Sequence, residues 1–210
     1  MSTQNYSSNI KRPIEELTDW NILVQFATSS PIISVQEIAD AFVTEGLQRE
    51  WIADGVVSQS EKQESELWRI RELMVPAQKM AGNSIKHDIS VPVARLPDLV
   101  KEVNASVTNI DSRVIPYPFG HIGDGNLHYN MMLPCGLDQQ ERTTIKELIH
   151  REVYDIVATM NGSFSAEHGI GMIKRHQMAL FKPSVELDMM KKIKHCLDPQ
   201  NQMNPGKVLP

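Results

Sequence analysis

Two histidines flank a glycine-rich stretch in the segment Phe119-Gly-His121-Ile-Gly-Asp-Gly-Asn-Leu-His128. Its Asp124-Gly125 pair is a strong signal for a two-residue hairpin turn. Such a turn would place His121 directly opposite His128 on one face of a sheet, with Asn130 on the same face. Two imidazoles in this arrangement can hold one divalent metal ion. The alternative is a pair of surface or packing histidines beside an ordinary turn.

A second segment, Ser-Ala-Glu-His-Gly-Ile-Gly over residues 165–171, sets an acid beside an imidazole. Glu167 is a candidate third metal ligand, and a set of three would leave coordination positions open, as in catalytic sites. His168 would then be free to act as a general base, because histidine side chains titrate close to neutral pH. The alternative is a polar turn before a helix over 172–180, with Glu167 favouring the N-terminus of that helix.

Two cations complete the chemically suggestive set: Arg71 in Trp-Arg-Ile-Arg-Glu and Lys86 in Ile-Lys-His-Asp-Ile-Ser. A guanidinium binds a carboxylate through two parallel bonds and an ammonium adds a point charge, so the pair could anchor an acidic substrate. Taken singly, each also fits a solvated charge on a helix or strand. The remaining histidines lack a partner pattern and are interpreted as structural or surface residues: His87, His150, His176 and His195.

The apolar pattern predicts the elements that must position these residues. Residues 1–19 are expected to form a flexible N-terminal arm. Strands are predicted over 21–28, 55–57, 85–93, 113–119 and 126–133. Helices are predicted from Ser34 (with Glu37 completing a capping box), over 61–80 until Pro76 ends or kinks it, and over 96–110, 138–160 and 184–197. This order predicts an α+β fold with helices covering one face of a sheet.

Composition limits the class of protein. The chain has 210 residues, 41% of them hydrophobic and 22% charged, which is ordinary for a globular protein with a real core. With 21 Lys and Arg against 26 Asp and Glu, the net charge of −5 gives no general attraction to nucleic acid or anionic lipid. No apolar run is long enough to span a membrane. Neither GxGxxG nor GxxxxGK[ST] occurs, so no local cradle for a nucleotide phosphate is predicted.

The cysteines and the N-terminus indicate the compartment. The first ten residues are polar and lack the apolar region of a secretory signal. Cys135 and Cys196 lie far apart and form no CxxC motif. We therefore expect a reducing, cytoplasmic location, with both thiols buried as small hydrophobic groups.

Three motifs in a fixed order together resemble one known family. They are Gly-His-Ile-Gly-Asp-Gly-Asn-Leu-His (120–128), Ser-Ala-Glu-His-Gly-Ile-Gly (165–171) and a tail from Asp198-Pro199 to Asn204-Pro-Gly-Lys207. The chain resembles the C-terminal (cap and substrate) domain of the FAD-linked 2-hydroxy-acid oxidases and dehydrogenases, from about Trp20 onward. The resemblance implies a ferredoxin-like antiparallel sheet covered by helices, as one domain over residues 20–210.

The resemblance also implies a metal site and a base. His121, His128 and Glu167 match the positions of the family's metal ligands, for which zinc is the first candidate and manganese or iron the next. His168 matches the catalytic base.

Further matches imply how substrate and flavin are held. Arg71 and Lys86 would bind the substrate carboxylate, and Asn130 would contact substrate or metal. Asn204 of the Asn-Pro-Gly-Lys tail would reach the flavin ring. Val75 departs from the pattern, because relatives that handle dicarboxylates tend to carry a hydroxyl residue there. This departure puts a second, distal carboxylate in doubt.

The implied reaction is oxidation of a D-2-hydroxy acid, of the D-lactate, glycolate or D-2-hydroxyglutarate class, to the 2-oxo acid. A hydride passes to FAD and the metal polarises the hydroxyl. Because the sequence contains no recognisable FAD-binding domain, we expect the chain to need such a domain or subunit as a partner and to be inactive alone. A homo-oligomer is also compatible with the sequence. Two alternatives stay open: a non-catalytic metal-binding or dimerisation module, and a metal-dependent hydrolase that uses the same two histidines and glutamate.

Overall fold

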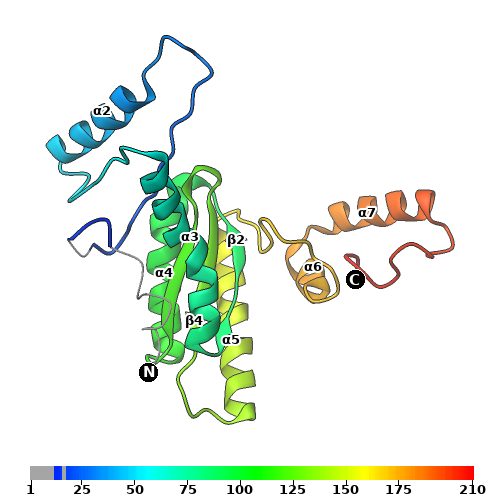
Figure 1. Ribbon diagram of the computed structural model, residues 1–210. Coiled ribbons are helices and arrows are strands. Elements are labelled where there is room, and N and C mark those ends of the chain that lie inside the picture. The colour runs from blue at the N-terminus through cyan, green and yellow to red at the C-terminus, as the bar shows by residue number, and fades with distance from the viewer. Residues whose placement is uncertain (1–11, 16–17) are drawn as a thin grey trace. The chain divides into compact units, whose positions relative to one another are not determined.

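A computed structural model of the chain describes residues 12–15 and 18–210. The chain divides into two compact units, Met1–Ala81 and Gly82–Pro210 (Figure 1). Most of the N-terminal arm predicted for residues 1–19 lies outside the described residues. The assignment of residues 20–210 to one domain stays a prediction.

The first unit contains two helices that begin where the sequence predicts. Helix α2 (Val35–Gln48) is capped by Ser34, whose side chain accepts a hydrogen bond from the Glu37 backbone N–H at 3.2 Å. Helix α3 (Glu61–Ala81) agrees with the helix predicted over 61–80 and continues through Pro76, so of the two effects predicted for this proline, an end or a kink, the end does not occur.

The strands predicted over 21–28 and 55–57 do not form, and both segments are irregular. A β-prone segment needs a partner strand for its backbone hydrogen bonds. Among the described residues of the first unit no strand offers one. Apolar, β-prone composition alone was therefore not enough to predict a strand in these two segments.

The second unit is built on an antiparallel sheet with β4 (Asn126–Met132) in its centre. β3 (Ile115–His121) pairs with one edge of β4, while β1 (Ser84–Ile85) and β2 (Asp88–Ser90) pair with the other. Ile85 lies opposite Met131 and Asp88 opposite His128, so β1 and β2 keep one register and form a single strand row interrupted at residues 86–87.

The order of elements in this unit is that of a ferredoxin-like fold. Helix α4 (Leu96–Ile110) follows the first strand row, β3 and β4 follow as a hairpin, and α5 (Gln139–Thr159) comes next. At the position of the fourth strand, a single antiparallel bridge joins Ser163 to Ser90 of β2. This β-α-β-β-α-β order with antiparallel pairing confirms the predicted α+β class and antiparallel sheet.

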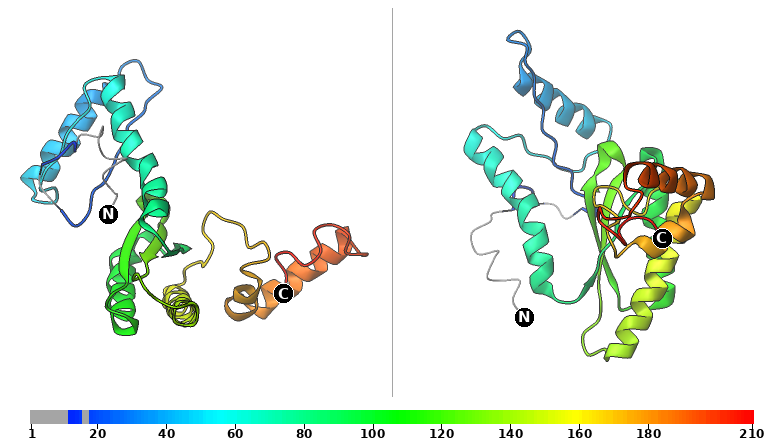
Figure 2. Two further views of the ribbon diagram at one scale, coloured as in Figure 1. Left: turned by 60° about the horizontal axis from the view of Figure 1, so that its bottom comes forward. Right: turned by 90° about the vertical axis from the view of Figure 1, so that its right-hand side faces the viewer.

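Helices α4 and α5 lie side by side over one face of the sheet (Figures 1 and 2). Helix α5 begins with a complete capping box between Asp138 and Glu141. The strands alternate, so one face of the sheet turns apolar side chains to these helices and the other face is left for polar ones. The resulting core includes Ile85, Ile89, Leu99, Val103, Val107, Leu127, Tyr129, Met131, Ile149, Val153 and Val157.

The rest of the second unit continues through α6 (Arg175–Phe181) and α7 (Ser184–Leu197). The C-terminal tail returns to the start of α6, where the Val208 N–H donates to the Gly171 carbonyl at 2.8 Å. Cys135 and Cys196 are exposed, so the expectation that both thiols are buried is wrong. Of the helices in the described part of the chain, none has the length and apolarity needed to cross a membrane.

Candidate functional site

The hairpin that carries the two motif histidines differs in register from the prediction. His121 lies opposite Asn126, and His128 lies opposite Phe119, a shift of two residues. The reason is a longer connection: a 3-10 turn, η2 (Ile122–Asp124), and Gly125 in the left-handed region at φ 72°. Because side chains alternate with a period of two, this shift leaves both histidines on the same face of the sheet.

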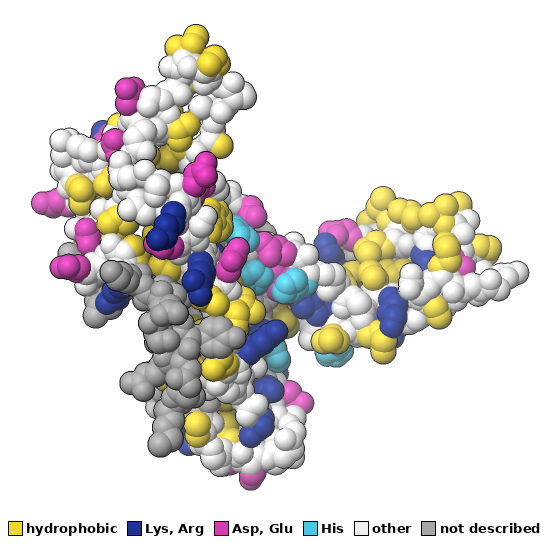
Figure 3. Space-filling view, in the orientation of Figure 1, with side chains coloured by type: hydrophobic (Ala, Val, Ile, Leu, Met, Phe, Trp, Pro, Cys, Tyr) yellow, Lys and Arg dark blue, Asp and Glu magenta, His cyan; other side chains and the backbone are white. Residues whose placement is uncertain are grey.

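The three predicted metal ligands converge on the Glu167 carboxylate. His121 Nδ1 lies 2.8 Å from Glu167 Oε1, and His128 Nε2 lies 3.2 Å from Oε2. Each carboxylate oxygen is therefore taken by one imidazole. The side chain of His128 is 15% exposed and that of His121 is 54% exposed, so the cluster reaches from the sheet face to solvent. Figure 3 shows histidine and acidic side chains gathered side by side on the surface.

His168, the predicted base, lies next to this cluster. Its ring stacks beside that of His128, with centroids 5.5 Å apart. Its Nδ1 lies 3.5 Å from Asp88 Oδ2, and its side chain is 65% exposed. The structure thus places an accessible imidazole beside both a buried carboxylate and His128.

Motif reasoning did not identify Asp88 as a member of the site. It lies on β2 directly opposite His128, and the residue is only 3% exposed. Burial acts to raise the pKa of Asp88, but backbone N–H groups of His168 and Glu167 and the nearby charges of His168 and Lys174 outweigh it, and the pKa is lowered. One signal was available: aspartate is depleted in strands, so an aspartate inside a predicted strand needs an explanation.

The donor atoms fit a divalent cation. Two groups of side chains each bring their ligand atoms within 4.8 Å of one another: Asp88, His128, Glu167 and His168 in one, His121, Asp124 and Glu167 in the other. Glu167 belongs to both groups and joins them. Imidazole nitrogens together with carboxylate oxygens are the donors that zinc and related metals use in catalytic sites.

The predicted substrate-binding residues are placed as follows. Lys86 is exposed and lies between β1 and β2, and the common register of these strands sets it level with Asn130, which is buried on β4. Arg71 lies half-buried on α3 of the first unit. Asn204 is exposed in the C-terminal tail, at φ 49°. The roles of all four stay predictions.

His87 and His150 form a pair that the sequence did not reveal. His87 is 2% exposed, and its Nδ1 lies 2.9 Å from the Tyr129 carbonyl oxygen. A carbonyl accepts only, so Nδ1 carries the proton and the opposite nitrogen, Nε2, is the acceptor for His150 Nδ1 at 2.9 Å. Burial lowers the pKa of His87 to about 3, with the His150 charge acting in the same direction. The two histidines are therefore partners of one another, and their interpretation as structural or surface residues stays a prediction.

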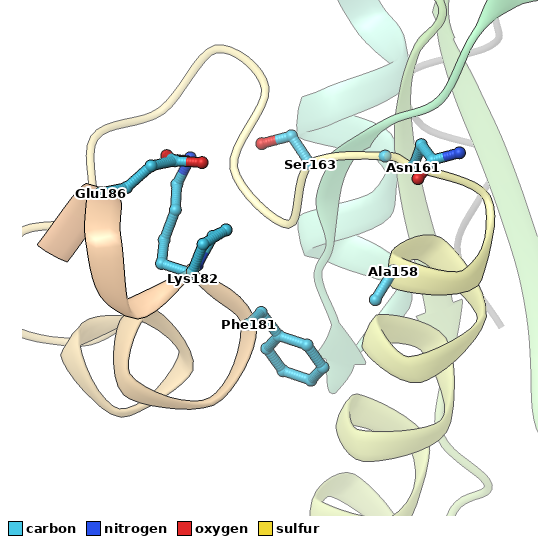
Figure 4. A pocket seen from close by; sticks show the side chains of 8 residues that line it. Ala158, Asn161, Ser163, Phe181, Lys182 and Glu186 are labelled. Atoms are coloured by element: carbon cyan, nitrogen blue, oxygen red, sulfur yellow. Dashed lines mark hydrogen bonds and ion pairs between the residues drawn. The ribbon is translucent and has the colours of Figure 1, made fainter.

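A cavity lies at the C-terminal end of α5 and is lined by residues of the ranges 158–163 and 181–186 (Figure 4). Lys182 and Glu186, which line it, form an ion pair at 2.8 Å. Their charges offset each other, and no predicted site residue lines the cavity. It is therefore not the candidate site.

Comparison with known proteins shows which family the chain belongs to. Residues 1–208 match the family described as FAD linked oxidases, C-terminal domain. A D-2-hydroxyglutarate dehydrogenase of Stutzerimonas stutzeri is 34% identical over 95% of this chain and 42% of its own length. The mitochondrial D-2-hydroxyglutarate dehydrogenases of Arabidopsis thaliana and Bos taurus are 33% and 32% identical, over 98% and 94% of this chain. The chain spans 35% of the length of each of these two.

Proposed function

Because the chain belongs to the family of FAD-linked oxidase C-terminal domains, we propose that it is the cap and substrate portion of a flavin-dependent dehydrogenase. The substrate would be a D-2-hydroxy acid, and the product the 2-oxo acid. D-2-hydroxyglutarate is the first substrate to test, because the relatives described above carry that name. D-lactate and glycolate are tested beside it, because Val75 argues against binding of a second carboxylate. The observation that carries the proposal is the convergence of His121 and His128 on Glu167, beside His168.

In this proposal His121, His128 and Glu167 hold a divalent metal ion, with zinc as the first candidate. A metal ion bound there would polarise the substrate hydroxyl as a Lewis acid, and FAD, held mainly by a partner domain or subunit, would take the hydride. The donor set is the support for this assignment: two imidazoles and one carboxylate in contact, with a further imidazole alongside.

The remaining side chains would bind the substrate and move its proton. Lys86 would pair with the substrate carboxylate and fix its orientation, and Asn130, level with Lys86 in the sheet, would donate or accept a hydrogen bond beside it. For Arg71, the support for a role in binding the carboxylate is its match to the family motif. His168 would take the hydroxyl proton on Nε2, because its Nδ1 faces Asp88 at 3.5 Å. Asn204 in the tail would contact the flavin.

The test is to combine this chain with a flavin-binding domain of the family and to assay D-2-hydroxyglutarate, D-lactate and glycolate with an artificial electron acceptor. We expect oxidation of a D-2-hydroxy acid that depends on both halves. His168→Gln should lower kcat by a factor of about 10² to 10⁴, the usual contribution of a general base, and leave bound metal in place. Oxidation at an unchanged rate in this variant would refute the role of His168.

The same assay separates the alternatives. A metal-dependent hydrolase would turn over a hydrolysable substrate without flavin, and a non-catalytic module would show no turnover with any flavin partner. A cytoplasmic location stays a prediction, since the named relatives include mitochondrial proteins.

A further inference from the structure

The Asp88 carboxylate is surrounded by backbone N–H groups from one short segment. The N–H of Ala166 donates to Oδ2 at 3.1 Å, and that of His168 donates to the same oxygen at 2.8 Å. The Glu167 N–H lies 3.2 Å from both carboxylate oxygens. Three consecutive amides therefore point at one buried carboxylate, and the middle one belongs to the glutamate that meets both motif histidines.

Other contacts fix the carboxylate and the segment in place. Asn126 Nδ2 donates to Asp88 Oδ1 at 3.3 Å. The Lys174 ammonium lies 3.8 Å from Oδ2 and donates to the Phe164 carbonyl at 3.0 Å and to Ser165 Oγ at 3.1 Å. A carboxylate that is 3% exposed is stable as an anion only where such donors and charges replace water. The Asp88 carboxylate is therefore held in a fixed position by these donors, and it in turn holds the backbone segment that supplies three of them.

We propose that Asp88 is a positioning residue, whose carboxylate holds the 166–168 backbone over the sheet so that the Glu167 and His168 side chains meet His128. The sheet supplies His121 and His128 from the β3–β4 hairpin, whereas Glu167 and His168 come from an irregular segment. The backbone of this segment bonds to β2 through the Ser90–Ser163 bridge and from the Ala166 N–H to the Asp88 carbonyl oxygen at 3.3 Å. Such a segment needs a fixed point, and Asp88, opposite His128 in the sheet, provides one. This inference rests on the proposed function for the roles of Glu167 and His168.

The chain contains a matched control for this anchor. Asp198 is also buried, at 7% exposed, and accepts the backbone N–H groups of Gln202 and Met203 at 2.8 Å each, with Lys194 as its cation. It organises the C-terminal tail by the same kind of contact, outside the donor groups described above. Asp198→Asn and Asp88→Asn therefore remove equivalent anchors at different places.

The first measurement is titration of the full chain with zinc by calorimetry at pH 7. Asp88→Asn keeps the size of the side chain but replaces one acceptor oxygen with a donor that faces the amides. We expect its zinc Kd to rise about 10- to 100-fold, the usual effect of removing a residue that orients metal ligands, while Asp198→Asn keeps the wild-type Kd. Equal zinc affinity in wild type and Asp88→Asn would overturn the proposal.

The second measurement is amide hydrogen exchange of residues 164–170, which needs no metal. Exchange should accelerate at 166–168 in Asp88→Asn and stay at the wild-type rate in Asp198→Asn; unchanged exchange in Asp88→Asn would overturn the proposal. If wild type binds no zinc, the proposed metal site fails, while exchange still decides whether Asp88 holds the segment. If Asp88→Asn does not fold, Asp88→Asn/Lys174→Met is compared with Lys174→Met in the same two measurements, because both lack the Lys174 contacts to Phe164 and Ser165 and differ only in the Asp88 carboxylate.

Discussion

The buried pair of His87 and His150 makes the second unit sensitive to acid. In the folded protein the pKa of His87 is about 3, lowered from 6.5 mainly by burial. Between these two values the unfolded chain binds a proton on this side chain and the folded protein does not. Stability is therefore fully present above pH 6.5 and falls as the pH is lowered towards 3. Burial lowers the pKa of His150 as well, which acts in the same direction.

The size of the effect follows from these values. Each pH unit below 6.5 costs about 1.4 kcal/mol in the free energy of unfolding, so His87 alone costs about 2 kcal/mol at pH 5. The substitution His87→Phe removes the titrating group and keeps a ring that packs against Tyr154, whose ring centroid lies 5.5 Å away. The change in unfolding free energy between pH 7 and pH 5 should then be about 2 kcal/mol smaller in the variant than in wild type.

Urea unfolding followed by circular dichroism at pH 7 and pH 5 measures this difference. The comparison uses the change with pH and not the absolute stability, so a loss of packing that is equal at both pH values does not confound it. Tyr154→Phe is the control, because burial raises the pKa of this tyrosine and keeps it neutral throughout the window. The reasoning would be refuted if wild type, His87→Phe and Tyr154→Phe lost the same free energy between pH 7 and pH 5.

Three further substitutions test the positioning of the site by the fold, each by urea unfolding at pH 7. Gly125→Ala should destabilise by at least about 2 kcal/mol, because φ is 72° and a Cβ would lie 2.0 Å from the Val91 carbonyl oxygen; a stability within 0.5 kcal/mol of wild type would contradict the turn geometry. Asp138→Ala removes the cap of α5 and should cost about 1 kcal/mol, and no change would mean that the cap contributes nothing. Tyr129→Phe loses the bond from its hydroxyl to Asn104 Oδ1 at 2.7 Å and should also cost about 1 kcal/mol, whereas a stabilised variant would contradict it.

Local signals predicted the helices well. The ranges predicted over 96–110 and 184–197 agree with α4 and α7, because spacing of apolar residues and capping act within a few turns. The prediction of a strand over 21–28 was wrong because a strand forms only when another strand pairs with it. The sequence of the segment does not indicate whether such a partner is present. Exposed Cys135 and Cys196 show the same limit, since burial depends on what packs against a residue.

The candidate site was predictable in part. The face that carries His121 and His128 followed from the period of two, although the register was wrong by two residues, because the loop conformation at Gly125 is set by contact with Val91, far away in sequence. The motifs grouped Glu167 with His121 and His128, and in the structure the Glu167 carboxylate contacts both imidazoles. The role of Asp88 was not predictable from spacing, since 78 to 80 residues separate it from the amides that it binds.

An X-ray structure of crystals grown with zinc, with diffraction recorded above and below the zinc absorption edge, tests the metal site most directly. The proposed function predicts one anomalous peak at about 2.0 to 2.2 Å from a nitrogen of His121, a nitrogen of His128 and an oxygen of Glu167, with His168 unligated. A peak bound elsewhere, or no peak in crystals whose zinc content is confirmed, would contradict it.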